Sequence, residues 1–441
     1  MKRELYLPYF KGKRVTVMGL GLLGRGVGDT AFLASVCGEV IVTDKKTSEE
    51  LKESVDVLKD CSNIIFNLGK HDLKDFENRD FILKAAGVPL ESEFINHARD
   101  EGVPVYMSAA LVVKIIKEKL QNVKVIGVTG TRGKSTATHL IEHILKESGK
   151  RVHIGGNVRG VANLPLLNEI EDGDYLVLEL DSWQLQGFGD FKISPGISLF
   201  TSFLDDHLNY YHNDREIYFK DKANIFLYQK DGDVCIGSRQ AQEEILKRGD
   251  KKIIVPEVVQ IDSNLIGVHN DVAISLAIEV VIQCGIKKEE AIKAIKSFKA
   301  VDGRLQYLGE YRNVKVFNDN NGTTPEAVIV GLDAIEEKFK KKPILIVGGA
   351  DKGLNLSELE KAILNKTKDV VYLSGEGTNK ISLDKKYEFE KLENCVDKSF
   401  ELSQDGDIII FSPGFSSKSK YFNNEYERND LFVTCIERYN I

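Results

Sequence analysis

The chain has 441 residues, 42% of them hydrophobic, and a formal net charge of −7 at pH 7. This length predicts two or three domains with hydrophobic cores, and the acidic balance argues against nucleic acid or an anionic membrane as a partner. No apolar run approaches a membrane span, the N-terminal segment lacks an apolar leader core, and the six cysteines have no metal-binding spacing. We therefore expect a reduced cytoplasmic protein without membrane insertion.

Short apolar runs alternate with helical patterns along the chain, which predicts α/β folding around parallel sheets. A strand at residues 14–18 leads into the glycine-rich turn 19–24 (GLGLLG) and a helix, and a second strand at residues 39–43 ends at Asp44. A GxGxxG turn with an acid about twenty residues later is typical of a dinucleotide-binding fold, with phosphate held at the helix N-terminus. A glycine turn required only for packing is the alternative.

A second glycine-rich turn predicts a nucleoside triphosphate site. An apolar strand at residues 123–128 precedes the turn, and a helical pattern at residues 135–147 follows it. In the general pattern Lys134 neutralises the β- and γ-phosphates and the Ser135 hydroxyl ligates Mg²⁺. Val128 stands where that pattern has its first glycine, so the motif has the shortened form Gly130, Thr131, Arg132, Gly133, Lys134, Ser135.

Three residues downstream of this turn carry metal-binding or anion-binding chemistry. Glu179 ends a strand at residues 175–180, where Mg²⁺ on the phosphates needs a further ligand, and a solvated strand end is the alternative. Asp206 and His207 follow a strand at residues 197–202, and the pair is equally consistent with a metal or anion site and with a core histidine. Lys222 lies on an expected helix, and from residue type alone it is a surface lysine.

The last third of the chain offers loops for anionic groups. Arg304 and Asp319 are equally consistent with nucleotide binding and with a structural ion pair. Lys352 lies in a glycine-rich turn after a strand at residues 343–347, and the turn 412–417 presents hydroxyl and N–H groups. Ordinary turn chemistry is the alternative. We expect three α/β domains: a Rossmann-like domain at residues 1–108, a P-loop ATPase-like parallel sheet at 109–300, and a second Rossmann-like domain at 301–441.

The motifs, taken in order, resemble the Mur ligase family, the ATP-dependent amide-forming enzymes of peptidoglycan precursor synthesis. The resemblance covers essentially the whole chain. It rests on residues 19–24 (GLGLLG), 130–136 (GTRGKST), 155–157 (GGN), 178–185 (LELDSWQL), 205–207 (DDH), 267–270 (GVHN), 303–306 (GRLQ), 318–319 (ND), 351–353 (DKG) and 412–417 (SPGFSS).

Within the family, residues 178–185 look like the segment of the members that add D-glutamate to UDP-N-acetylmuramoyl-L-alanine. The resemblance implies that ATP phosphorylates the terminal carboxylate of this substrate. The amine of D-glutamate then attacks the acyl phosphate and expels phosphate. It also implies three α/β domains, a monomer, ATP and two Mg²⁺ ions as cofactors, and a carbamate on Lys222.

The resemblance assigns roles residue by residue. The catalytic set would be Lys134, Glu179, His207 and Lys222, and the metal ligands Ser135, Glu179, His207 and Lys222. ATP would contact Gly130, Thr131, Arg132, Gly133, Lys134, Ser135, Thr136, Asn270, Arg304 and Asp319. Substrates would contact Leu22, Leu23, Asp44 and Asn157 on the UDP-linked side and Lys352, Ser417 and Phe422 on the glutamate side.

The sequence departs from the family pattern at several places, among them a turn of the first domain and the stretch after the ND pair. The first-domain SPG turn reads Ala85, Ala86 and Gly87, and the lysine expected after the ND pair is Asn321. Four alternatives stay open at this point. They are a family member adding a different amino acid, a folylpolyglutamate synthetase-like ligase, a nicotinamide-dependent oxidoreductase, and a catalytically silent nucleotide-binding regulator.

Overall fold

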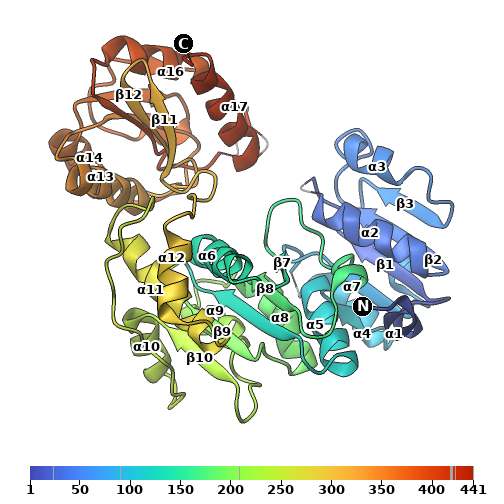
Figure 1. The fold of residues 1–441 in the computed structure, drawn as a ribbon. Coiled ribbons are helices and arrows are strands. Elements are labelled where there is room, and N and C mark those ends of the chain that lie inside the picture. The colour runs from blue at the N-terminus through green and yellow to red at the C-terminus, as the bar shows by residue number, and fades with distance from the viewer. Residues whose placement is uncertain (23, 90, 208, 418–420, 423, 441) are drawn as a thin grey trace. The chain divides into compact units, whose positions relative to one another are not determined.

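The computed structural model describes residues 1–441 apart from residues 23, 90, 208, 418–420, 423 and 441. Its β-strands form three sheets, each with its own helices (Figure 1). By its contacts the chain divides into two compact units: residues 1–257 with 275–291, and residues 258–274 with 292–441. The first unit contains two sheets and the second contains one. The expected α/β class is confirmed, and no helix of the described residues is long and apolar enough to cross a membrane.

The first sheet is parallel and has the strand order β3-β2-β1-β4-β5. Strands β1 and β2 are buried along nearly their whole length, as expected for a sheet covered on both faces. The strands are β1 Arg14–Met18, β2 Glu39–Asp44, β3 Ile64–Leu68, β4 Phe81–Lys84 and β5 Val105–Tyr106; the helices are α1 Arg3–Tyr6, η1 Leu7–Tyr9, α2 Arg25–Val36, α3 Lys52–Leu58, η2 Leu73–Phe76 and α4 Glu93–Asp100.

The second sheet, also parallel, has the order β10-β9-β6-β8-β7. The central strand β6 leads into the triphosphate-type turn, and its neighbours β8 and β9 end at the same edge. The strands are β6 Lys124–Thr129, β7 Val152–Gly156, β8 Tyr175–Glu179, β9 Ile197–Phe200 and β10 Val234–Gly237; the helices are α5 Ser108–Lys119, α6 Lys134–Glu147, α7 Leu166–Glu169, α8 Ser182–Phe191, α9 Arg215–Ala223 and α10 Arg239–Leu246.

The third sheet has the order β11-β12-β16-β13-β14-β15, and only β11 is antiparallel. Alternate residues of β13 enter two separate cores: Leu345 packs with residues of α13 and α14, and Ile346 packs with residues of α16 and α17. The strands are β11 Gln306–Tyr311, β12 Val314–Asn318, β13 Ile344–Val347, β14 Asp369–Leu373, β15 Glu388–Phe389 and β16 Ile408–Phe411; the helices are α13 Pro325–Phe339, α14 Ser357–Lys366, α15 Glu376–Asn379, α16 Leu392–Leu402 and α17 Glu425–Glu437.

Two helices connect the units along the chain, α11 at Val268–Gln283 and α12 at Lys288–Ile295. The division between units falls inside α11, between Ile274 and Ser275, and again inside α12, between Ala291 and Ile292. The chain therefore passes from one unit to the other three times.

Candidate active site

The turn after β6 is closed by its glycines and fixed to the neighbouring strand β9. A Cβ on Gly130, whose φ is +143°, would lie 2.0 Å from Thr201 Oγ1, so only glycine fits there. Thr131 N donates to Ser202 O at 2.8 Å, and Arg132 N donates to Ser202 Oγ at 2.9 Å. Helix α6 begins directly after Gly133, with Ser135 half-buried and Thr136 buried in its first turn. A helix N-terminus held this way presents backbone N–H groups to an anion.

Two lysines from different helices converge on one carbonyl of this turn. Lys134 Nζ donates to Gly130 O at 3.0 Å and to Thr131 O at 3.2 Å, and Lys222 Nζ donates to Gly130 O at 3.0 Å. Lys222 is only 2% exposed, so the expectation of a surface lysine from residue type alone is wrong. Burial first, and then the Lys134 charge, hold the pKa of Lys222 well below its usual range.

Glu179 and His207 reach the same edge of the second sheet. Glu179 ends β8, pairs with Val128 and Gly156 in register, and is 4% exposed. The His207 ring packs against Trp183 with centroids 4.6 Å apart, and its Nε2 lies 3.5 Å from Asp206 Oδ2. Burial lowers the pKa of His207, and Asp206 opposes this shift. Among the described residues, His, Cys, Asp and Glu side chains alone form no group of three that could hold a metal.

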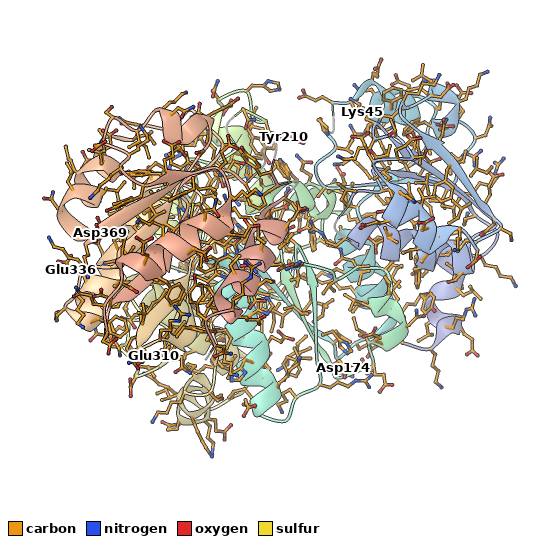
Figure 2. All side chains as sticks on the ribbon, turned by 90° about the horizontal axis from the view of Figure 1, so that it is seen from above. Lys45, Asp174, Tyr210, Glu310, Glu336 and Asp369 are labelled. Atoms are coloured by element: carbon orange, nitrogen blue, oxygen red, sulfur yellow. The ribbon has the colours of Figure 1, made fainter. Side chains whose placement is uncertain are left out.

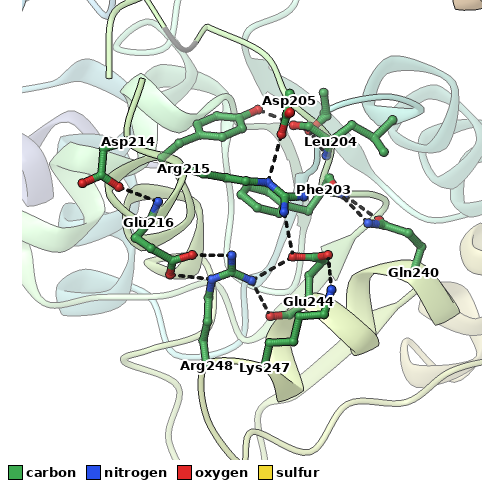
Figure 3. Close-up of polar contacts among 12 residues, drawn as sticks. Phe203, Leu204, Asp205, Asp214, Arg215, Glu216, Gln240, Glu244, Lys247 and Arg248 are labelled. Carbon is green, nitrogen blue, oxygen red and sulfur yellow. Dashed lines mark hydrogen bonds and ion pairs between the residues drawn. The ribbon is translucent and has the colours of Figure 1, made fainter. Parts of the chain in front are cut away.

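A network of charged side chains anchors the loop that carries Asp205, Asp206 and His207 (Figure 3). Arg215 Nε lies 2.9 Å from Asp205 Oδ1, and its Nη1 lies 3.6 Å from Glu244 Oε2. The backbone of Phe203 exchanges two 2.7 Å hydrogen bonds with the Gln240 side chain. Gln186 Nε2 contacts the Tyr210 hydroxyl at 3.2 Å, and Tyr210 packs against Trp183. Figure 2 labels Tyr210 among the side chains of the molecule. These contacts fix the loop without using the His207 ring nitrogens.

The first glycine-rich turn lines a cavity of about 230 Å³ in the first unit. Asp44 is buried, and its carboxylate accepts hydrogen bonds from Leu20 N at 2.9 Å, Gly21 N at 3.3 Å and Lys46 N at 3.0 Å. Leu22 is 42% exposed at the turn, and Leu23 lies outside the described residues. Asp44 therefore shapes the turn through its carboxylate, a role that its position at a strand end does not reveal.

Asn157 follows β7, and its backbone N donates to Glu179 O at 2.7 Å. Its side-chain oxygen accepts a hydrogen bond from Arg25, the first residue of α2. Sequence reasoning missed Arg25, although a cation in the first turn of a helix is unfavourable for the helix and was a usable signal.

In the second unit, the loops after β12, β13 and β16 lie at the carboxyl ends of neighbouring parallel strands. Asp319 accepts from Leu305 N at 3.1 Å and from Ser412 Oγ at 2.7 Å. Lys352 Nζ donates to Thr323 Oγ1 at 2.9 Å, which joins two of these loops and makes Thr323 a residue that sequence reasoning missed.

The other predicted residues of this unit differ in exposure. Arg304 is exposed, whereas Asn270 is buried and donates from Nδ2 to Ile266 O at 2.8 Å. Ser417 is 6% exposed, and Phe422 packs into the core formed with α16 and α17. Their predicted ligand contacts stay predictions.

Comparison with known proteins agrees with this arrangement. The family descriptions "Mur ligase middle domain" and "Mur ligase, glutamate ligase domain" match residues 128–264 and 303–415. A protein of Borreliella afzelii (strain PKo), named UDP-N-acetylmuramoylalanine–D-glutamate ligase, is 32% identical over 98% of this chain and 99% of the relative.

Two solved structures share the fold at lower identity. The UDP-N-acetylmuramate-alanine ligase MurC of Thermotoga maritima is 18% identical with a TM-score of 0.63, covering 97% of this chain and 99% of that one. MurF ligase of Thermotoga maritima, in complex with ADP, is 16% identical with a TM-score of 0.61, covering 99% and 100%. With two family domains matched and a full-length relative above 30% identity, this chain belongs to the Mur ligase family.

Proposed function

We propose that this enzyme uses ATP to join D-glutamate to UDP-N-acetylmuramoyl-L-alanine, through an acyl phosphate, in peptidoglycan precursor synthesis. The observation that carries the proposal is the turn after β6, where Lys134 and the buried Lys222 share Gly130 O. A carboxylate is a poor acyl donor, and phosphorylation by ATP supplies the leaving group that amide formation needs. The name of the Borreliella relative supports the choice of substrates.

The residues at the edge of the second sheet have different roles in phosphoryl transfer. The backbone N–H groups at the start of α6 bind the phosphates, and Lys134 exchanges its carbonyl partners for phosphate oxygens. Two Mg²⁺ ions, when bound, neutralise charge on the transferring phosphoryl group. Ser135 and Glu179 would hold one ion, and His207 and Lys222 the other. His207 suits this role because its lowered pKa favours the neutral imidazole that metals require.

Lys222 fits a carbamate better than an ammonium. An ammonium repels a cation, whereas burial and the lowered pKa of Lys222 favour the neutral amine that can react with CO₂. Its lone pair attacks the carbon of CO₂, an N–C bond forms, one C=O electron pair moves to oxygen, and the nitrogen releases a proton to water. The product is an anion with two oxygens, which supplies the ligands that the neighbouring side chains lack.

The remaining contacts are assigned as the resemblance implies. The UDP moiety would lie at Leu22, Leu23 and Asp44, with Asn157 near the reacting carboxylate. The rest of the ATP molecule would contact Asn270, Arg304 and Asp319, and D-glutamate would contact Lys352, Ser417 and Phe422. We place the reaction in the cytoplasm and expect the enzyme to act as a monomer.

The test is phosphate release from ATP with Mg²⁺ and UDP-N-acetylmuramoyl-L-alanine, with the product identified by mass. D-glutamate, L-glutamate, D-aspartate, L-lysine and no amino acid are compared. We expect release and product with D-glutamate only. Release with another amino acid would keep the mechanism and replace the acceptor, which Asn321 in place of the family lysine makes a specific alternative. No release with any of them would overturn the proposal and favour a silent regulator.

A further inference from the structure

Arg25 stands at the junction of the first and second sheets within the first unit. It is the first residue of α2 and follows Gly24, whose φ is +78°. A Cβ on Gly26 would lie 2.1 Å from Leu20 O, so the turn closes tightly on the start of the helix and fixes the Arg25 backbone. A Cβ on Gly28 would lie 2.5 Å from Ala162 Cβ, so the same helix packs closely on the loop after β7.

Two cationic side chains line the cavity beside this turn, and they differ in how many of their N–H donors are already hydrogen-bonded. Lys84 Nζ donates to the backbone oxygens of Ala85, Ala86 and Val88, at distances from 2.5 to 3.3 Å, so carbonyls occupy all three of its N–H donors. Arg25 also lines the cavity, and it donates to the side-chain oxygen of Asn157. A guanidinium has five N–H donors, and within the part of the chain that the structure describes its one hydrogen bond is to Asn157, so Arg25 keeps the capacity to bind an anion.

Arg25 is linked through Asn157 to the residues of phosphoryl transfer. Asn157 N bonds Glu179 O, and Glu179 ends the strand next to the triphosphate-type turn. The chain of contacts therefore runs from the first glycine-rich turn, through Arg25 and Asn157, to the edge of the second sheet. A substrate with its diphosphate at the first turn and its carboxylate at this edge would pass both side chains.

We propose that Arg25 is a substrate-binding residue, whose guanidinium contacts the diphosphate of the nucleotide-linked substrate and releases Asn157 to bind that substrate. The inference rests on the proposed function for the identity of the substrate. The planar guanidinium matches two phosphate oxygens at once, which the ammonium of a lysine cannot do. Arg25 thus adds a side-chain contact to a turn that otherwise offers mainly backbone N–H groups.

The test compares Arg25→Gln and Arg25→Lys with the wild type. UDP and ATP binding are measured separately by calorimetry. Losing a charge-assisted pair costs about 10- to 100-fold in affinity, so we expect UDP binding by Arg25→Gln to weaken by that factor. ATP binding should stay within about twofold, and Arg25→Lys should recover only part of the loss. The matched control is Arg3→Gln, because Arg3 lies in the same unit and likewise donates a side-chain hydrogen bond, to Ser35 O at 3.0 Å.

Each outcome decides the proposal. If Arg25→Gln binds UDP as tightly as the wild type, the proposal is overturned. A loss of ATP affinity equal to the loss of UDP affinity, or a lowered melting temperature, would show a structural role and would overturn it as well. In turnover, the variant should raise the KM for the UDP-linked substrate and leave the KM for ATP unchanged. If the wild type ligates no D-glutamate but binds UDP in an Arg25-dependent way, the proposed function fails and this inference stands.

Discussion

Replacing Asp29 by asparagine should change how the stability of the first unit depends on pH. Asp29 lies in α2, and its Oδ1 accepts from Leu164 N at 2.7 Å, which connects the first sheet's helix to the loop before α7. The side chain is 5% exposed. Burial raises the pKa of this carboxyl from 3.8 to about 6, although the Leu164 N–H opposes the shift.

The sign follows from which state holds the proton. Below pH 3.8 the carboxyl is protonated in both states and contributes nothing to the pH dependence. Between pH 3.8 and about 6 the unfolded chain has released the proton and the folded chain retains it, so the free energy of unfolding falls as pH rises. At about 1.4 kcal/mol per pKa unit, the ionised carboxyl lowers the free energy of unfolding by about 3 kcal/mol above pH 6.

Asp29→Asn keeps the hydrogen-bond acceptor for Leu164 N and cannot ionise. Its free energy of unfolding relative to that of the wild type should therefore rise by about 2.5 kcal/mol between pH 4 and pH 7. Urea unfolding at a series of pH values measures this difference, followed by the fluorescence of Trp183, the single tryptophan of the chain, which lies in the same unit. Asp56→Asn is the control, because Asp56 is exposed on α3. If the free energy of unfolding of the variant minus that of the wild type stays flat or falls from pH 4 to pH 7, the reasoning is refuted.

Three further predictions test the turn, the carbamate and the third sheet. Gly130→Ala should weaken ATP binding at least tenfold by calorimetry, because its Cβ meets Thr201, whereas Gly149→Ala, with a positive φ but open space, should not. Lys222→Ala should lose most of its ligase activity and regain part of it when bicarbonate or short carboxylates are added. The wild-type enzyme under ¹³CO₂ should show a carbamate NMR signal that the variant lacks. Wild-type activity in the variant would exclude Lys222 from the site. Arg428→Met, which loses bonds of 2.8 and 2.9 Å to Asn320, should lower the free energy of unfolding by about 2–4 kcal/mol in urea, and Arg428→Lys should lose less; equal stability of all three proteins would contradict this.

Local sequence patterns predicted the elements that depend on neighbouring residues. The strand at residues 123–128, the turn and the following helix are observed as β6 and α6 with small shifts at their ends. The pattern is local because glycine geometry, β propensity and helix periodicity act within a few residues. Strand β11 was missed because it is half-exposed, lies at a sheet edge, and has an irregular register between Tyr307 and Gly309.

Side-chain environments could not be predicted in the same way. Lys222 is buried because its helix places the amine on Gly130, 92 residues earlier in the chain. Arg25 and Asn157 are 132 residues apart, and no local pattern connects them. The carboxylate of Asp44 accepts hydrogen bonds from the glycine-rich turn, and its position at a strand end did not reveal this contact. Such contacts depend on the tertiary fold, which a single sequence reveals only through a family resemblance.

The division inside α11 has a consequence for anyone who wishes to isolate part of this enzyme. Residues 275–291 belong to the first unit although they follow a stretch that belongs to the second. A fragment ending at residue 257 would lose the Cys284 carbonyl, which accepts from Lys124 Nζ at 3.2 Å and from the Tyr175 hydroxyl at 3.4 Å. The ATP-binding region is therefore not a contiguous, excisable module. A productive fragment would need a designed connection that restores the missing helix.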